Sequence, residues 1–272
     1  MGEYPGFTLG EGDGRIGFED VAMSGHSKWS QIKRQKGVTD ARRGQLFTKL
    51  TREIIVAARD GGSNPETNFR LRLGIQRARD GSMPLENIER AIKRGSGELE
   101  ASKLDEITFE GYDPNGVAVL AQTVTDNRNR TIQDVRRFFS RHGGNLGEPG
   151  CVGWLFELKG VVIMEASDVD GDELALRAID AGAEDFKMER GYLEVYTTTQ
   201  NLETVRKALE RQKPVVSAEL SLLPKTTITL EEKDATQTLH FLDQLEELSD
   251  VQRVFCNVDF TDVVLERLRA QA

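Results

Sequence analysis

The sequence predicts an α+β protein of three domains: a basic three-helix bundle followed by two α/β domains of ferredoxin-like character, the third inserted in the second. Amphipathic helical patterns separated by tight turns occupy residues 39–95, and the order β-α-β-β-α-β can be read between residues 160 and 222. A further helix and strand come after that unit, and we expect them to complete the sheet that begins near Ile107. At 272 residues, the chain is long enough for each domain to bury its own core.

Changes in composition predict where the domains begin and end. Residues 1–22 are rich in glycine and acids, resemble neither a signal peptide nor a transit peptide, and are predicted to be a disordered N-terminal extension. A Gly-, Ser- and Glu-rich stretch from Gly95 to Ser102 predicts a linker. The predicted domains are a basic helical domain at 23–98, a discontinuous α/β domain at 105–158 plus 224–268, and an inserted ferredoxin-like domain at 160–222.

Helix caps and helix breakers predict the bundle. N-capping residues such as Thr and Asp, and prolines, mark helix starts, and glycines mark helix ends. The first predicted helix runs from Thr39 or Asp40 to about Asp60 and is stopped by Gly61 and Gly62. The second starts at Pro65, and the third runs from Pro84 to Gly95.

Alternating and helical hydrophobic patterns predict the elements of the other two domains. In the second domain they are the strands Ile107–Tyr112 and Val117–Thr125, a helix capped by Thr131 that ends at Gly143, and a strand Cys151–Leu158. In the third domain the predicted strands are Val161–Glu165, Phe186–Glu189, Leu193–Thr197 and Ala218–Leu222. The helix Glu173–Ala181 follows the first strand, and the helix Leu202–Glu210 follows the third. The chain then continues with the strand Thr226–Leu230, the helix Ala235–Leu248 and the strand Val251–Val258.

Charge is segregated along the chain. Residues 24–98 contain 16 Lys and Arg against 8 Asp and Glu, whereas residues 99–272 contain 19 against 32. The whole chain has a formal net charge of −9, so an acidic protein concentrates its cations in one segment. That asymmetry indicates an interaction surface for a polyanion, because clustered cations bind phosphate backbones by releasing condensed counterions.

The basic stretch from Met23 to Ile55 supplies most of the candidate nucleic-acid-binding residues. They are His26, Lys28, Trp29, Lys33, Arg34, Lys36, Arg42, Arg43, Lys49 and Arg52. The alternative is a solvated charged face. Trp29 lies among the cations, where an indole can stack on an unpaired base, but a lone Trp is about as often a packing anchor.

A second candidate segment lies between a predicted strand and a helix start. Arg128 and Arg130 stand there beside free backbone N–H groups that suit a phosphate, although a polar connection with a Thr cap accounts for the segment equally well. On the following helix, four more residues either extend this surface or form a charged outer face, which is the simpler interpretation: Arg136, Arg137, Arg141 and His142.

Catalytic patterns are not found in the sequence. His26, His142 and His240 lack metal-ligand spacing, and neither a Gly-x-Ser-x-Gly elbow nor a Walker loop occurs. Cys151 and Cys256 are too few and too far apart for a disulfide framework or a zinc site. We therefore expect a protein that is not an enzyme, has no cofactor, metal or small-molecule substrate, does not span a membrane, and resides in the cytoplasm.

Several motifs resemble the YebC/PmpR family. They are GHSKW at 25–29, DARRGQLFTKLTREI at 40–54 and MPLENIERAIKRGSG at 83–97, with a GG-x-L-G turn at 143–147 before Trp154 and Phe156. The similarity extends from Met23 to the end, with departures at Leu85, Gly74 and Cys151. The resemblance implies three domains and a role as a probable transcriptional regulator, whereas mitochondrial members of the family are translational activators.

Three functions are compatible with these observations. The leading hypothesis is a non-enzymatic nucleic-acid-binding regulator that acts on promoter DNA. The first alternative is a translation factor that binds ribosomal or messenger RNA, with the ribosome as a candidate partner. A flexible cationic arm with a Trp, and the lack of a helix-turn-helix pattern, favour RNA. The second alternative is a protein-interaction scaffold in which the acidic part of the chain binds a basic partner.

Overall fold

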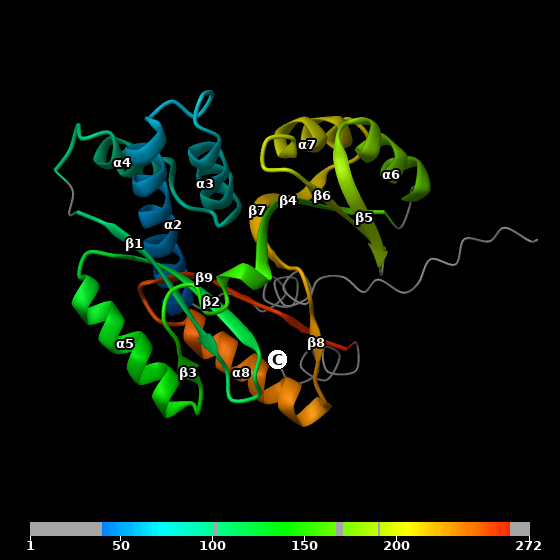
Figure 1. The fold of residues 1–272 in the computed structure, drawn as a ribbon. Coiled ribbons are helices and arrows are strands. Elements are labelled where there is room, and N and C mark those ends of the chain that lie inside the picture. Colours follow the sequence, from blue (N-terminus) through cyan, green and yellow to red (C-terminus); the bar gives the residue numbers. More distant parts are fainter. Residues whose placement is uncertain (1–39, 101–102, 167–170, 190, 262–272) are drawn as a thin grey trace, which may run out of the picture.

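The structure is a computed structural model that describes residues 40–100, 103–166, 171–189 and 191–261. The predicted disordered extension and the basic arm before Asp40 lie outside the described residues. Figure 1 shows the helical bundle at the upper left, the second domain below it, and the third domain at the upper right. None of the helices within the described ranges is long and apolar enough to cross a bilayer.

The bundle consists of three helices around one apolar core. They are α2 (Asp40–Gly61), α3 (Phe69–Asp80) and α4 (Leu85–Gly95). Ile54, Leu71 and Ile88, one from each helix, are almost completely buried. The predicted first and third helices are confirmed, and Pro84 is the residue immediately before α4.

The prediction that the second helix starts at Pro65 is wrong. Asn68 is the N-cap, because its side chain accepts a hydrogen bond from the backbone N–H of Leu71. The same side chain donates to the backbone carbonyl oxygens of Ala57 and Gly62, at 2.7 Å each. Asn68 thus fixes both the start of α3 and the end of α2, and Pro65 is left in the turn between them.

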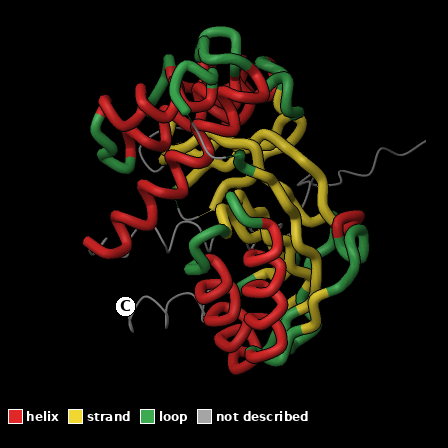
Figure 2. Tube along the Cα trace, turned by 90° about the vertical axis from the view of Figure 1, so that its left-hand side faces the viewer, coloured by secondary structure: helices red, strands yellow, loops and turns green. Residues whose placement is uncertain are grey.

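The second domain is a four-stranded antiparallel sheet covered on one face by two helices, α5 and α8, with strand order β3-β1-β2-β9. Its elements are β1 (Asp105–Tyr112), β2 (Ala118–Thr125), α5 (Arg128–Arg141), β3 (Asn145–Leu146), α8 (Glu232–Glu246) and β9 (Val251–Cys256). Phe139 and Leu242 of the helices pack with Val119 and Val254 of the sheet, and Figure 2 shows helices and strands as separate layers. Because β9 pairs with β2, the chain returns to its first sheet after the third domain, which confirms the predicted insertion.

Helix α5 starts earlier than predicted. Thr131 is not its cap; the side chain of Asn127 accepts a hydrogen bond from the backbone N–H of Arg130, at 3.1 Å, and the helix begins at Arg128. Thr131 is buried within the first turn, where its hydroxyl donates to Asp250.

The third domain has the ferredoxin-like arrangement that the sequence predicts. Its sheet has the order β5-β6-β4-β7, and helices α6 and α7 pack on one face through Leu174, Leu202 and Val205. Its elements are β4 (Phe156–Glu165), α6 (Gly171–Asp180), β5 (Ala183–Glu189), β6 (Tyr192–Thr197), α7 (Leu202–Glu210) and β7 (Val215–Pro224). The short strands β8 (Ile228–Thr229) and β10 (Val258–Asp259) form a separate parallel pair, and Ile228 and Val258 pack in the core of the second domain.

The prediction of a separate strand at Cys151–Leu158 is wrong. A 3₁₀ turn, η1 (Gly153–Leu155), precedes β4, which then runs without interruption to Glu165. The cause is Glu110 on β1, whose carboxylate accepts hydrogen bonds from the backbone N–H groups of Gly150, Val152 and Gly153 at 2.7–2.9 Å. These bonds hold the segment as a loop against β1 and leave the Trp154 side chain 65% exposed.

Candidate nucleic-acid interface

Two cations of α2, Lys49 and Arg52, contact the second domain. The Lys49 ammonium donates to the backbone carbonyl oxygen of Glu246. Arg52 Nη1 donates to the carbonyl oxygen of Ser249 at 2.8 Å and lies 3.0 Å from Asp250 Oδ1. Both side chains therefore attach the bundle to the connection between α8 and β9.

Asp250 is the centre of this contact and is only 4% exposed. Its Oδ2 accepts hydrogen bonds from Thr131 at 2.7 Å and from Arg130 Nη2 at 2.8 Å. Burial by itself raises the pKa of this carboxyl, but the hydrogen bonds from Arg130 and Thr131 and the nearby charge of Arg52 outweigh it and hold the pKa below its usual value. The carboxylate is therefore charged at neutral pH and holds two of the predicted phosphate-binding arginines together.

Arg128 and Arg130 have different surroundings although they are two residues apart. Arg130 also pairs with Asp126 at 2.8 Å, so both of its anionic partners belong to the same domain. Arg128 is exposed and has no hydrogen bond or ion pair to any residue that the structure describes. Both residues are exposed, but only Arg130 has carboxylate partners among the described residues.

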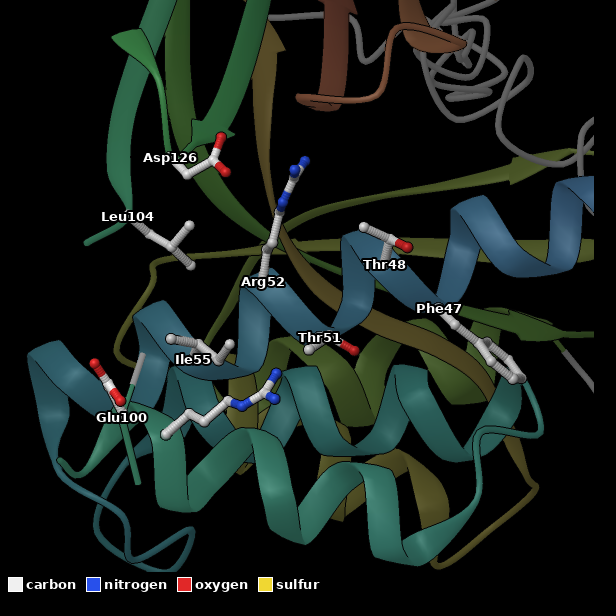
Figure 3. Close-up of a pocket in the computed structure, with 9 residues that line it drawn as sticks. Phe47, Thr48, Thr51, Arg52, Ile55, Glu100, Leu104 and Asp126 are labelled. Carbon is white, nitrogen blue, oxygen red and sulfur yellow. The ribbon is translucent and has the colours of Figure 1, made fainter. Parts of the chain in front are cut away.

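A cavity of about 480 Å³ lies where α2, the linker after α4 and the end of β2 meet (Figure 3). In Figure 3, Arg52 extends from α2 toward Asp126. The lining residues are Phe47, Thr48, Thr51, Arg52, Ile55, Arg94, Glu100, Leu104 and Asp126. Two cations are balanced by two carboxylates in this lining, so the cavity is not by itself an anion site, but its volume lies in the range of small-molecule pockets.

The predicted site residues are only partly placed by the structure. Arg43 is exposed near the start of α2. Lys49, Arg52 and Arg130 meet at the junction between bundle and second domain, and Asp250 brings Arg52 and Arg130 together. The predicted site residues of the arm lie outside the described residues, as does the side chain of Arg42. Those arm residues are His26, Lys28, Trp29, Lys33, Arg34 and Lys36.

Further cations of the bundle face solvent. Arg79 on α3 and Lys93 and Arg94 on α4 are exposed, and their side chains have no hydrogen bond or ion pair within the described part of the chain. The neighbouring Arg90, by contrast, pairs with Glu86 at 2.5 Å. The helical pattern of α4 contains the signal for Lys93 and Arg94, because its apolar residues occupy the opposite face.

The cysteines are poor candidates for nucleophiles. Burial, followed by the charge of Glu110, raises the pKa of Cys151, and burial raises the pKa of Cys256 to about 12. Both thiols are therefore protonated at neutral pH. His142 stacks on Phe138 with 4.2 Å between ring centroids, and no group of three or more His, Cys, Asp or Glu in the described ranges could hold a metal ion.

Comparison with known proteins assigns both parts of the chain to one family. Residues 27–98 match the TACO1/YebC protein N-terminal domain, and residues 104–258 match the TACO1/YebC second and third domain. A probable transcriptional regulatory protein of Dehalococcoides mccartyi strain CBDB1 is 55% identical over 251 residues, which cover 92% of this chain and 100% of that protein. Another of Chloroflexus aurantiacus strain J-10-fl is 51% identical over 252 residues, covering 91% of this chain and 100% of that protein.

A solved structure is similar over most of the molecule. The crystal structure of a conserved hypothetical protein from Aquifex aeolicus aligns with a TM-score of 0.76 and 47% sequence identity, covering 86% of this chain and 97% of that chain. The sequence and structural matches both extend across all three domains. The chain therefore belongs to the TACO1/YebC family.

Proposed function

We propose that this protein is a non-enzymatic nucleic-acid-binding regulator whose basic N-terminal segment binds phosphate groups. The observation that carries the proposal is the charge of residues 24–98, which is +8 in a chain whose net charge is −9. Such a segment gains binding free energy when it displaces the counterions condensed on a nucleic acid. The names of the relatives, which are probable transcriptional regulatory proteins, support the regulatory role.

The contacts within the molecule narrow the set of cations that serve this function. Lys49 and Arg52 contact the second domain, and phosphate binding would have to compete with those contacts. The cations of residues 26–36, together with Arg79, Lys93 and Arg94, are therefore the principal phosphate ligands in this proposal. Their residue types position a protein on a backbone without reading base sequence.

Promoter DNA is the target that the names of the relatives support. RNA engaged during translation is the second candidate, and the observation that favours it is Trp29 between Lys28 and Lys33. An aromatic ring among cations suits an unpaired base, which RNA loops offer and duplex DNA does not.

Crosslinking in cells, followed by sequencing of both bound RNA and bound DNA, tests the proposal and separates the targets. The test variant is Lys33→Glu/Arg34→Glu/Lys36→Glu, and the matched control reverses three exposed cations elsewhere, Lys207→Glu/Arg211→Glu/Lys233→Glu. We expect enrichment of discrete promoters, or of ribosomal or messenger RNA, that the test variant loses and the control keeps. Equal enrichment for all three proteins, or none for any, would refute the proposal.

A further inference from the structure

The outer face of α5 has an unusual composition for this chain. Asp134, the acidic residue of the helix, is half-buried and lines a small pocket with Leu248 and Ser249. The exposed side chains of α5 are Arg128, Asn129, Arg130, Gln133, Arg136, Arg137, Ser140 and Arg141. They comprise five arginines and three neutral polar residues, and no carboxylate is among them.

Comparison with the other helices shows that this composition is specific to α5. Residues 99–272, to which α5 belongs, contain 19 Lys and Arg against 32 Asp and Glu. Each of the other described α-helices exposes at least one carboxylate: Asp60 on α2, Asp80 on α3, Glu86 on α4, Asp172 on α6, Glu210 on α7 and Glu232 on α8. The acidic part of the chain therefore presents one helix face with only positive and neutral groups.

Four of the five arginines on this face lack internal partners, whereas Arg130 pairs with Asp126 and Asp250. Arg136, Arg137 and Arg141 form no hydrogen bond or ion pair with any residue in the described ranges, and neither does Arg128. The arginines within the helices of the third domain behave differently, since the exposed Arg177 pairs with Glu173 at 2.5 Å and the half-buried Arg206 with Glu203 at 3.0 Å. The guanidinium groups of Arg128, Arg136, Arg137 and Arg141 are thus available to an external anion.

The outer face of α5 is held by the core of the second domain and begins next to the basic bundle. Val135, Phe138 and Phe139 on the opposite side of α5 are buried in the core of the second domain. The helix has 14 residues and is roughly 20 Å long. It lies at the edge of the molecule in Figure 1, and its start is next to the bundle, because Arg94 of α4 and Asp126 line the same cavity.

We propose that the outer face of α5 is a second nucleic-acid contact, which binds the phosphate backbone of a double helix while the basic N-terminal segment binds elsewhere on the same molecule. This inference rests on the proposed function. The residue types exposed on α5, which are Arg, Asn, Gln and Ser, all form hydrogen bonds with phosphate oxygens in protein–nucleic acid complexes. The exposed face has no aromatic side chain, and single-strand binding relies on aromatic stacking, so a regular duplex backbone is the better fit.

Fluorescence anisotropy over a range of salt concentrations tests this inference. It measures binding of the full chain to a labelled RNA duplex, a DNA duplex and a single strand. The test variant is Arg137→Glu/Arg141→Glu. The control is Arg211→Glu/Lys233→Glu, which makes the same change in charge at exposed residues of α7's end and α8. A second control, Arg137→Lys/Arg141→Lys, keeps the charge. Circular dichroism checks that all variants are folded. If the charge-reversal variant Arg137→Glu/Arg141→Glu does not fold, Arg137→Gln/Arg141→Gln replaces it.

For the test variant, we expect weaker duplex binding and a log–log salt slope that is shallower by about 1.8, or about 0.9 for each of two lost phosphate contacts. The control and the lysine variant should keep the wild-type slope. The preference among RNA and DNA duplexes identifies the source of the backbone.

The possible failures are distinguishable. An unchanged duplex slope in the α5 variant, with binding lost in Lys33→Glu/Arg34→Glu/Lys36→Glu, overturns this inference and leaves the proposed function standing. Wild-type protein that binds none of the three nucleic acids overturns both. Competition by polyglutamate as strong as by the duplex, lost in the α5 variant, overturns the assignment to nucleic acid and indicates an acidic protein partner.

Discussion

Asp250 is a buried carboxylate on which groups from three elements converge. Arg52 comes from α2, Thr125 from the end of β2, and Arg130 and Thr131 from α5. We expect Asp250→Asn to lower the free energy of unfolding by about 3 kcal/mol, because the partners lose the charge that compensates their partial burial. Urea denaturation measures the effect. Asp126→Asn removes the exposed partner of Arg130 and should cost less than about 1 kcal/mol; equal effects of the two variants would contradict the assigned role of Asp250.

The pH dependence of stability provides a separate test of the same carboxylate. Its pKa is depressed in the folded protein, so its contribution is fully present above the unfolded value of about 3.9 and is lost as the pH falls through the folded value. We therefore expect the stability difference between wild type and Asp250→Asn to be constant from neutral pH to about pH 5 and to shrink only in stronger acid. Urea titrations at stepped pH measure it, and a difference already lost near neutral pH would refute this account.

The positions of individual cations show the limit of sequence reasoning at the residue scale. The helical pattern of α2 correctly predicts which side is apolar, with Leu50 and Ile54 buried. It cannot predict that Lys49 and Arg52 contact carbonyl groups 197 residues away in sequence, since those partners belong to another domain. Free arginines on α5 and paired arginines on α2 look alike until the partners are known.

At the scale of an element, the start of α5 depends on one side chain. Asn127 caps the helix, whereas Asn129 is exposed within the first turn. We expect Asn127→Ala to lower the free energy of unfolding by about 1 kcal/mol, the usual cost of a lost N-cap. Asn129→Ala is the matched control and should leave stability nearly unchanged in the same urea titration. An equal effect at both positions would show that the cap contributes nothing specific.

Helix existence is predictable here, and helix starts are less so, for a reason that α3 and α5 share. Each start lies in a run with several residues that can cap, such as Asn64 and Asn68, or Asn127 and Thr131. Tertiary contacts select among them: Asn68 also binds the carbonyl of Ala57, and the hydroxyl of Thr131 binds Asp250. Local propensity contains no information on either contact.

Two helical glycines should respond in opposite directions to alanine. A Cβ on Gly74 would make ordinary contact with Ile54 Cγ1 at 3.5 Å, so Gly74→Ala should stabilise by up to about 1 kcal/mol through helix propensity. A Cβ on Gly95 would lie 2.5 Å from the carbonyl oxygen of Ile55 and 2.6 Å from Ala58 Cβ, so Gly95→Ala should destabilise by about 1–3 kcal/mol as α4 moves away from α2. Thermal unfolding of both variants measures this, and a shift of the same sign in both would contradict the packing described.

At the scale of the whole molecule, four charged residues join the three domains. Arg77 of α3 bridges Glu53 of α2 and Glu219 of β7, at 2.6 Å each. Arg253 of β9 lies 3.1 Å from Glu53 and 4.0 Å from Glu219. Opposite charges alternate around this junction, so each domain contributes a group that neutralises those of the others.

Because the junction alternates in sign, removing one cation leaves two carboxylates sharing the other. We expect Arg77→Met to lower the free energy of unfolding by about 3 kcal/mol, and Arg77→Met/Glu219→Gln to recover part of that loss by removing one of the stranded charges. Arg79→Met, an exposed residue on the same helix, is the matched control and should have little effect. Scanning calorimetry measures all three. If the double variant is no more stable than Arg77→Met, repulsion between stranded carboxylates does not explain the loss, and the three domains are held in place by their apolar contacts instead.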